Sequence, residues 1–456
     1  MTQVKERTKI ATSLLVTFAV FSITAGLGNC SQTAVNALLN GISADMGVSV
    51  ATSQWLSTGY ILAFGVFVPL APFLIKRFSE RFMILLSLGA IAIGSLLIVL
   101  VPVFEVALFA RILQAAGAGL TMPAMQTMVM VDLPRDRMGF FMGINGVALG
   151  FMVNIGPSIS GALAEAFGWR SFFWFIFICM VLLVAPTIKY ARATGGSINE
   201  KFDFPSFLIC GFGFVGLLLG FSNASRMGFA TPLVWLPLLV GAVLLTLFVR
   251  REKRMDDPMV NMSIFANAQY RWGFIGMCIL FASYVGIMLV IPLYVQDLRG
   301  GSALDAGLVV LPASLVALVG NLGAGVLVDR IGARKVLIAS TAILLLGAVL
   351  AVPCDETTPL WYLALTQVIR GLGISASIGP FVGWSLADLP KRVVSDGSSF
   401  LTVGRQAAAS LGTSLMVLLI LVFSPDGPVA FAYQAAFAFA AVLSVFTLVL
   451  AIWKVR

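Results

Sequence analysis

Long apolar stretches separated by short polar segments recur along the whole chain. The hydrocarbon core of a bilayer is about 30 Å thick, so a helix that crosses it needs roughly 20 apolar residues. Fourteen stretches reach that length, at approximately 10–31, 52–74, 82–102, 105–129, 138–162, 170–190, 204–222, 232–250, 272–296, 304–327, 335–353, 359–381, 398–424 and 430–453. The first is too long for a cleavable signal peptide, and no small-residue cleavage site follows it. The pattern predicts an all-α integral membrane protein with 14 transmembrane helices.

The composition excludes the soluble classes of protein. Hydrophobic residues make up 59% of the 456 residues and charged residues 11%, whereas a soluble domain carries about 25% charged residues. The five cysteines form no CxxC pair and histidine is absent, so the sequence supports neither a zinc site, nor a disulfide framework, nor imidazole chemistry. We expect no cofactor and no metal.

The basic residues gather in alternate loops. Of the 29 Lys and Arg, 23 fall in the N-terminal tail, the even-numbered loops and the C-terminus. Three fall in odd-numbered loops (Arg170, Arg226 and Arg299) and three inside spans (Arg111, Arg370 and Arg405). Because cytoplasmic loops carry the excess of Lys and Arg, we expect a multi-pass protein of the cytoplasmic (inner) membrane with both termini in the cytoplasm. The net charge of +9 then reflects topology and not nucleic-acid binding.

Two motifs recur at nearly the same separation. Arg77 and Arg330 lie 253 residues apart, and Gly117-Ala-Gly119 precedes Gly371-Leu-Gly373 by 254. A shared separation predicts two related six-helix bundles with an inserted two-helix hairpin between them. The expected divisions are 1–190 for the first bundle, 191–270 for the linker and hairpin, and 271–456 for the second bundle. Many secondary transporters use such repeated halves to build two gates around one site at the membrane midplane.

Several short motifs in these spans follow a known pattern. They are Gly325-x-Leu327-x-Asp329-Arg330-x-Gly332-x-Arg334-Lys335 after the tenth span, Arg111-x-x-Gln114-x-x-Gly117-x-Gly119 in the fourth, Gly150 with Gly156-Pro157-Ser-Ile-Ser-Gly161 in the fifth, Pro292-Leu-Tyr294-Val-Gln296 in the ninth, and Arg405-Gln406 in the thirteenth. With them the chain resembles the major facilitator superfamily over essentially its whole length, and in particular the fourteen-helix drug:proton antiporter branch. The resemblance implies the major facilitator fold and alternating access.

The loop motif after the tenth span is a candidate gate. Glycine permits a tight turn, and a carboxylate can cap a helix start or pair with arginine, so Asp329, Arg330, Gly332 and Arg334 are expected to lock one gate. The first-half copy has Lys76 at the aspartate position. For that copy we favour the interpretation that its charges only orient the loop.

The fifth span is a second gating candidate. Gly150, Gly156 and Gly161 allow close helix packing, and Pro157 removes one backbone hydrogen bond. The resemblance implies a bend that seals the transporter against leak. Tight packing alone is the other interpretation, and the two are compatible.

Polar side chains inside the apolar spans are the candidates for substrate binding. An intramembrane arginine costs about 2.5 kcal/mol or more and usually faces a cavity or a partner. By resemblance, Arg111 contributes to proton transfer or substrate orientation; an arginine fixed by carbonyls at a helix contact is an equal alternative. Arg405 and Arg370 have the same two interpretations, with Arg370 favoured as structural because glycines flank it. The candidates are Asn29, Gln32, Asn36, Arg111, Gln114, Asn145, Asn154, Tyr284, Gln296, Asn321, Arg405 and Gln406.

Carboxylates are missing from the middle of the predicted spans. All 20 Asp and Glu fall in loops or near span ends, and Ser31 stands where the family's first helix usually has an aspartate. Proton coupling would therefore have to use interfacial carboxylates such as Glu165 or Asp297. Three intramembrane arginines without buried acids favour neutral or anionic amphipathic substrates.

The sequence thus predicts a secondary transporter that exports small amphipathic molecules, with proton coupling left open. The alternative within transport is an exporter or facilitator of an organic anion or metabolite without proton antiport. A membrane enzyme or lipid-handling receptor ranks lower, because the sequence has no HExxH motif or nucleophile constellation. The expected partners are a small-molecule substrate, membrane lipid and, with coupling, protons. We expect a monomer that does not bind nucleic acid.

Overall fold

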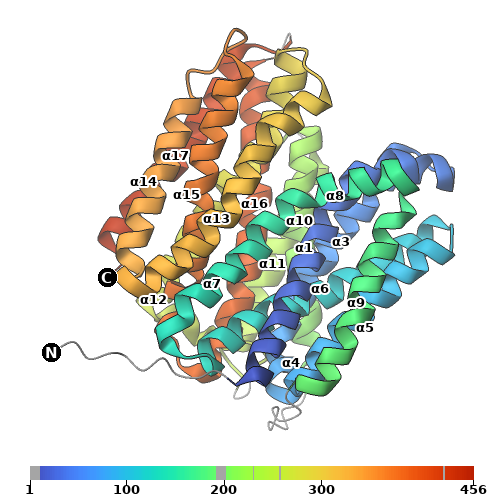
Figure 1. Cartoon of the computed structure of the whole chain (residues 1–456), viewed down its shortest axis with the longest axis vertical. Coiled ribbons are helices and arrows are strands. Elements are labelled where there is room, and N and C mark those ends of the chain that lie inside the picture. The colour runs from blue at the N-terminus through green and yellow to red at the C-terminus, as the bar shows by residue number, and fades with distance from the viewer. Residues whose placement is uncertain (1–10, 192–201, 230, 256–257, 425–426, 456) are drawn as a thin grey trace.

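The computed structural model of the protein is built from helices (Figure 1). It describes residues 11–191, 202–229, 231–255, 258–424 and 427–455, and within these ranges there is no β-strand. Thirteen helical segments of the described chain are long and apolar enough to cross a membrane. The remaining predicted span, 359–381, is α15 (Leu360–Ala387), whose 28 residues extend about 42 Å. Every predicted span is therefore found as helix, and the predicted fold class is confirmed.

The N-terminal bundle contains six membrane-crossing segments. They are α1 (Thr12–Met46); α2 (Val50–Ser53), α3 (Trp55–Phe67), η1 (Val68–Leu70) and α4 (Ala71–Arg77) in series; α5 (Glu80–Leu100); α6 (Phe104–Asp132); η2 (Arg135–Arg137), α7 (Met138–Gly146), η3 (Val147–Phe151) and α8 (Met152–Phe167) in series; and α9 (Arg170–Tyr190). Pro69 lies in the 3-10 turn η1, consistent with its missing N–H. Ser79 caps α5 by accepting a hydrogen bond from the Phe82 amide.

A helical hairpin follows the N-terminal bundle. It consists of α10 (Phe204–Met227), which Asp203 caps, and α11 (Pro232–Glu252), which begins at a proline. Helix α10 packs against α3 of the N-terminal bundle and α16 of the C-terminal bundle. Helix α11 packs on α10, and its outer row of Leu236, Leu239 and Val243 is exposed. In an integral membrane protein such a row faces lipid.

The C-terminal bundle contains the other six segments. They are α12 (Ala268–Leu293) with η5 (Tyr294–Leu298), preceded by the short η4 (Met262–Ala266); α13 (Ala303–Ile331); α14 (Ala333–Ala351); α15; η6 (Lys391–Val393) with α16 (Val394–Phe423); and α17 (Ala430–Trp453). Helix α12 packs on α16 and α17, and α15 packs on α13 and α14. Gly332 makes the tight turn between α13 and α14 at φ +88°, a backbone conformation that favours glycine.

The two bundles meet at one end and separate toward the other. We call the end that carries the basic loops, with Lys76, Asp329 and Lys391, the basic end, and the opposite one the parted end. At the basic end α7 packs against α13 and α15, and α6 packs against α16, whereas α8 packs chiefly against α1 and α9 of its own bundle. Figure 1 shows the C-terminal bundle, coloured yellow to red, leaning away from the N-terminal bundle toward the top.

Side-chain exposure along α8 agrees with this separation. Asn154 reaches Tyr284 of the other bundle. Ser158, Ala162 and Glu165 continue the same helix face toward the parted end, and all three are exposed. The face that joins the bundles at Asn154 is therefore uncovered farther along.

Candidate functional site

A small cavity lies where the two bundles touch, a contact surface that we call the seam. It is lined by Gly150 and Asn154 from the N-terminal bundle and by Tyr284, Gln367 and Arg370 from the C-terminal bundle. The Tyr284 hydroxyl donates to Asn154 Oδ1 at 2.7 Å and bridges the seam. The cavity volume is about 40 Å³, room for a few water molecules, whereas sites for drug-sized ligands occupy about 300–1,000 Å³. The seam is nearly closed at this level.

Arg370 lies on α15, buried at the wall of this cavity. Its Nη1 donates to Gln367 Oε1 at 3.1 Å, and its Nη2 donates to the Ser283 carbonyl at 2.9 Å. Its Nε has no hydrogen-bond partner within the described ranges. The backbone of Arg370 packs on α14 at Gly347, where a Cβ would lie 2.5 Å from the Arg370 nitrogen. The glycine that flanks Arg370 at position 373 packs on the same helix, because a Cβ there would clash with the Leu344 backbone. These glycines serve packing, while Arg370 itself lines the cavity.

Arg111 occupies the matching place in the N-terminal bundle. It is fully buried on α6, and its Nη2 donates to the Ser31 carbonyl of α1 at 3.0 Å. Its Nη1 donates to Ser31 Oγ and Gln114 Oε1, its Nε donates to the Leu56 carbonyl, and its guanidinium lies 4.2 Å from the ring centre of Tyr60. The geometry is that of an arginine fixed by backbone carbonyls at a helix contact. Gln114 in turn donates to Ser95.

The two arginines follow the internal repeat, with one reversal. Each joins the fourth helix of its bundle to a backbone carbonyl of the first, at Ser31 and at Ser283. Each also binds a glutamine one turn away, which follows Arg111 but precedes Arg370. Gln367 is a cavity candidate from the sequence because it places an amide in an apolar span, and the structure puts it at the cavity wall. Arg370, for which the structural interpretation was favoured, also lines the cavity. The inverted Gln–Arg spacing is the signal that relates this pair to Arg111 and Gln114.

Arg405 differs from both because its charge is not satisfied. It is buried on α16 with its guanidinium 4.9 Å from the ring centre of Phe281. Its Nε and Nη2 have no hydrogen-bond partner among the described residues, and neither do the buried hydroxyls of Ser399 and Thr402 on the same helix. A buried charge without a partner is costly. Arg405 is therefore the predicted site residue with the most capacity to bind an anionic or hydrogen-bond-accepting ligand.

Amides and hydroxyls join the bundles between the cavity and the basic end. Ser398 on α16 donates to Gln126 Oε1 on α6 at 2.6 Å, and Gln126 donates to Asn145 Oδ1 on α7 at 3.3 Å. Asn321 on α13 donates to the Ala317 carbonyl, and its side chain lies against Gly146, where an added Cβ would overlap it. Of the predicted binding residues, Asn145 and Asn321 thus lie in the seam.

The other predicted binding residues are not among those that line the small cavity. Asn29 is buried and donates to the Ala25 carbonyl within α1. Gln32 and Gln406 are partly buried, and Asn36 and Gln296 are exposed. Their role in binding stays a prediction.

The fifth-span residues join α8 to α1. Pro157 has no N–H, so the carbonyl four residues earlier, at Val153, lacks its helical partner. Thr33 Oγ1 of α1 donates to that carbonyl at 2.7 Å. Gly156 packs so closely that a Cβ would lie 2.6 Å from the Cys30 carbonyl, while Gly150 lies in the π-helical η3 and a Cβ on Gly161 would meet open space. Close packing is therefore found at Gly156 and not at Gly161, and the seal against leak stays a prediction.

At the basic end, Asp329 docks on the start of α7. Its carboxylate accepts hydrogen bonds from the amides of Gly139 at 2.7 Å and Phe140 at 2.9 Å. These are first-turn N–H groups that lack helical partners, and the helix dipole favours an anion there. Arg334 donates to the Ile452 carbonyl within its own bundle, and Arg330 is exposed. Of the predicted gating charges, Asp329 makes the contact between bundles.

The first-half copy of the loop motif makes the reciprocal contact with opposite charge. Lys76 Nζ lies 3.3 Å from both carboxylate oxygens of Asp396, in the first turn of α16. Asp396 is fully buried. Here the lysine occupies the motif position and the carboxylate lies on the partner helix. The interpretation that Lys76 only orients its loop missed this ion pair, because it joins residues 320 positions apart.

Two repeated six-helix bundles that close at one end define a multi-pass membrane transporter of the two-gate type. Comparisons with known proteins agree, since a model of the Major Facilitator Superfamily matches residues 16–412 and 273–456. The chain belongs to the major facilitator superfamily, whose members are transporters and not enzymes.

Similar curated proteins include drug-resistance transporters. The chain is 32% identical over 388 residues to the "Uncharacterized MFS-type transporter YcnB" of Bacillus subtilis, covering 85% of this chain and 82% of that protein. It is 27% identical over 402 residues to the "Lincomycin resistance protein LmrB" of Listeria monocytogenes, covering 88% and 85%. The resemblance to the drug antiporter branch is thereby confirmed.

Solved structures share the fold at low sequence identity. The human organic anion transporter MFSD10 (TETRAN) matches with a TM-score of 0.68 and 13% identity, over 96% of this chain and 99% of that one. The proton:xylose symporter XylE matches with a TM-score of 0.63 and 14% identity, over 95% of each chain.

Proposed function

We propose that this transporter exports small amphipathic molecules from the cytoplasm by alternating access, as a multidrug-type efflux protein of the bacterial cytoplasmic membrane. In this proposal the basic end faces the cytoplasm, in agreement with the positive-inside rule. The observation that carries the proposal is the asymmetry of the seam. Asp329 and Lys76 connect the bundles at the basic end, while Ser158 and Glu165 are exposed at the parted end. The described conformation is then the outward-open one.

Polar groups of the seam supply the substrate site in this proposal. Tyr284, Asn154, Gln367 and Arg370 surround the small cavity. In the described conformation the cavity is too small for a drug-sized ligand, so in this proposal it enlarges when the bundles rock. In this proposal the moving bodies are the two six-helix bundles, divided as predicted at residues 190 and 270.

Transport by the purified full chain in liposomes is the direct test. Resistance proteins among the relatives make lincomycin a reasonable first substrate. We expect lincomycin flux above that of protein-free liposomes, and a rate that changes when the pH gradient is reversed if an antiported proton drives export. Absence of flux for lincomycin and for a panel of neutral, cationic and anionic amphipaths would contradict the proposal.

A second candidate is export or facilitated passage of an organic anion or metabolite without proton antiport. The observation that favours it is Arg405, whose buried Nε and Nη2 have no partner in the part of the chain that the structure describes. No histidine is present in the sequence, and all carboxylates lie near span ends. The liposome assay separates the two: anion flux that is indifferent to the pH gradient favours this candidate, and flux of neutral or cationic amphipaths driven by the gradient favours the first.

A further inference from the structure

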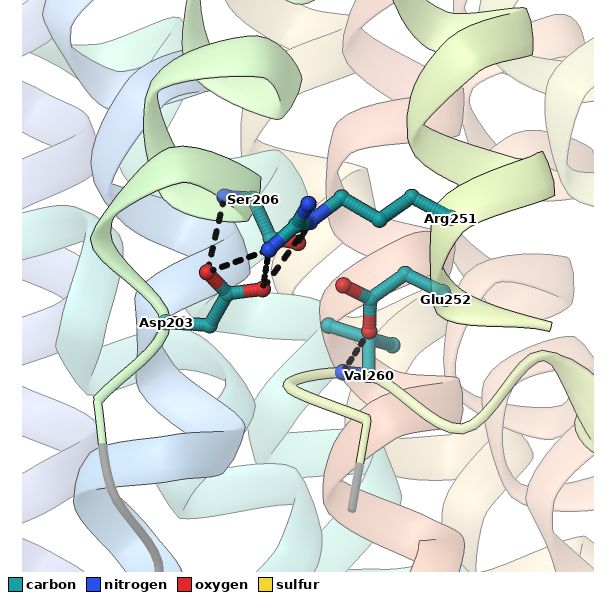
Figure 2. Close-up of polar contacts among 5 residues, drawn as sticks. All are labelled: Asp203, Ser206, Arg251, Glu252 and Val260. Atoms are coloured by element: carbon teal, nitrogen blue, oxygen red, sulfur yellow. Dashed lines mark hydrogen bonds and ion pairs between the residues drawn. The ribbon is translucent and has the colours of Figure 1, made fainter. Parts of the chain in front are cut away.

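A polar contact at the basic end of the hairpin pairs one of the arginines there with a carboxylate. Figure 2 shows Arg251 of α11 reaching across to Asp203 and Ser206 at the start of α10. Arg251 Nη2 lies 3.1 Å from Asp203 Oδ1, and its Nε lies 3.0 Å from Ser206 Oγ. This contact, which we call the hairpin clamp (Asp203, Ser206 and Arg251), holds the two helices together at their basic ends. The Asp203 carboxylate therefore forms its ion pair with Arg251.

The neighbouring acid, Glu252, binds a backbone amide. Glu252 is buried, and its Oε2 accepts a hydrogen bond from the Val260 amide at 2.9 Å (Figure 2). Burial raises the free energy needed to ionise the Glu252 carboxyl group, and the hydrogen bond from the Val260 amide offsets part of that rise. Glu252 faces the segment that leads to α12, and it does not line the groove beside the clamp.

That groove lies between α10 and α11 and has a volume of about 590 Å³. Its walls are Ile209, Leu247 and Met255, together with the arginines at positions 250, 251 and 254. Leu247 is 47% exposed and continues the lipid-facing row of α11. The groove therefore runs from an apolar surface at membrane depth into a cluster of cations at the basic end.

Two of the three arginines remain available for a ligand. Arg250 and Arg254 are exposed, and in the part of the chain that the structure describes neither forms an ion pair with a carboxylate. The charged groups around them are Arg251 and Asp203 in the clamp, the buried Glu252, and the exposed Lys253, which lines a separate groove. Asp256 and Asp257 follow in the sequence but lie outside the described residues.

We propose that this groove is a binding site for an anionic phospholipid, with the phosphate between Arg250 and Arg254 and an acyl chain along Ile209 and Leu247. Arginine donates paired N–H groups that fit phosphate oxygens. Basic pockets between transmembrane helices, at the side where anionic lipids are exposed, bind such headgroups. An inorganic phosphate ion shares the headgroup chemistry, but it would leave the apolar wall of the groove uncovered. The site is distinct from the seam, and its test does not depend on transport.

Native mass spectrometry of the purified full chain tests the site. The probes are phosphatidylglycerol and phosphatidylcholine in equal amounts. One basic contact at a membrane surface contributes about 1 kcal/mol, so the variant with Arg250→Gln and Arg254→Gln should lose roughly thirtyfold in affinity for phosphatidylglycerol. Lys253→Gln, which removes one charge from the same segment but not from the groove, should bind as the wild type does. Equal losses in both variants, or a double variant that binds normally, would overturn the proposal.

Two further arms distinguish the sources and need no variant. Inorganic phosphate should fail to displace phosphatidylglycerol from the wild-type chain; full displacement would assign the groove to a phosphate ion instead. Preference for phosphatidylglycerol over phosphatidylcholine should decline as sodium chloride is raised, because salt screens exposed charges. A preference that is insensitive to salt would also overturn the assignment.

Discussion

Arg111 and Arg405 are both buried in the membrane region, but they differ in what satisfies their guanidinium groups. Arg111 donates to Ser31, Gln114 and the Leu56 carbonyl. Arg405 has two donors without a partner among the residues that the structure describes, and its guanidinium lies over the Phe281 ring. The first arrangement contributes to stability. The second retains binding capacity at the expense of stability.

Substitution by glutamine should separate these two roles. We expect Arg111→Gln to lower the free energy of unfolding by about 3 kcal/mol, because it strands the carbonyls of Ser31 and Leu56. We expect Arg405→Gln to leave stability unchanged or raised, because it removes an unpaired buried charge, and to reduce transport of anionic substrates. Thermal unfolding in detergent and flux in liposomes measure the two effects. Undiminished anion transport by Arg405→Gln would contradict the binding role of Arg405.

The ion pair of Lys76 and Asp396 predicts a charge-exchange result. Lys76→Asp places two carboxylates together and leaves Asp396 buried without its partner, a change that costs about 3–5 kcal/mol for a buried pair. We expect it to destabilise the closed basic end, and we expect the double exchange of Lys76→Asp with Asp396→Lys to restore closure. Accessibility of a cysteine introduced at Ser398 to a water-soluble maleimide reports the opening. Equal labelling of the wild type and Lys76→Asp would contradict this role.

At the scale of elements, the fifth crossing is divided by η3 and by Pro157 into a half that packs across the seam and a half that stays with α1. The Thr33 hydroxyl stabilises the division because it donates to the Val153 carbonyl that Pro157 leaves without a partner. The hydroxyl of Ser160 adds a second tie from α8, to the Ala34 carbonyl.

A double-mutant cycle between Thr33 and Pro157 tests this division of labour. Thr33→Val alone should cost about 1–2 kcal/mol, because the Val153 carbonyl stays buried without a donor. In a Pro157→Ala background the backbone N–H at 157 can serve that carbonyl, so the cost of Thr33→Val should vanish. The free energies of unfolding of the four proteins give the coupling energy. A coupling energy near zero would show that the two residues act independently.

The hairpin clamp predicts a pH dependence local to α10. Partial burial opposes ionisation of Asp203, but the hydrogen bonds from Ser206 and Arg251 outweigh it and hold the pKa of this carboxyl below its ordinary value of 3.8. A group with a lowered folded pKa stabilises the fold above its ordinary pKa and loses that contribution as the pH falls through the folded value. Hydrogen-exchange protection of the first turn of α10 should therefore be constant above about pH 5 and fall below about pH 4. Asp203→Asn should lack this pH dependence, and an identical profile in both proteins would contradict the clamp.

For the molecule as a whole, the spans and the repeat could be predicted from the sequence, since lipid requires long apolar helices and duplication leaves recurring motifs. The ends of the helices could be predicted less well. Helix α1 continues to Met46, well past the apolar stretch that predicts it, because polar residues in its last turns lie at an uncovered surface. The apolar pattern still predicts the 359–381 span, although Gln367 and Arg370 make α15 more polar than its neighbours.

The candidate site was predicted in part. Tyr284, Asn154 and Asp329 are single residues whose polarity or motif marks them, and the structure brings each of them to the seam. The ion pair of Lys76 and Asp396 could not be predicted from the sequence, because the pairing depends on how the two bundles are rotated against each other. A single sequence does not specify that rotation.

Rocking of the two bundles around the seam is the central claim, and paired distances at both ends measure it directly. Spin labels at Glu165 and Gln296 report the parted end, and labels at Arg135 and Lys335 report the basic end, in a chain whose five cysteines are replaced. In nanodiscs, Lys76→Asp should lengthen the distances at the basic end and shorten those at the parted end relative to the wild type. Distances that stay fixed at both ends, or that lengthen together, would contradict the account.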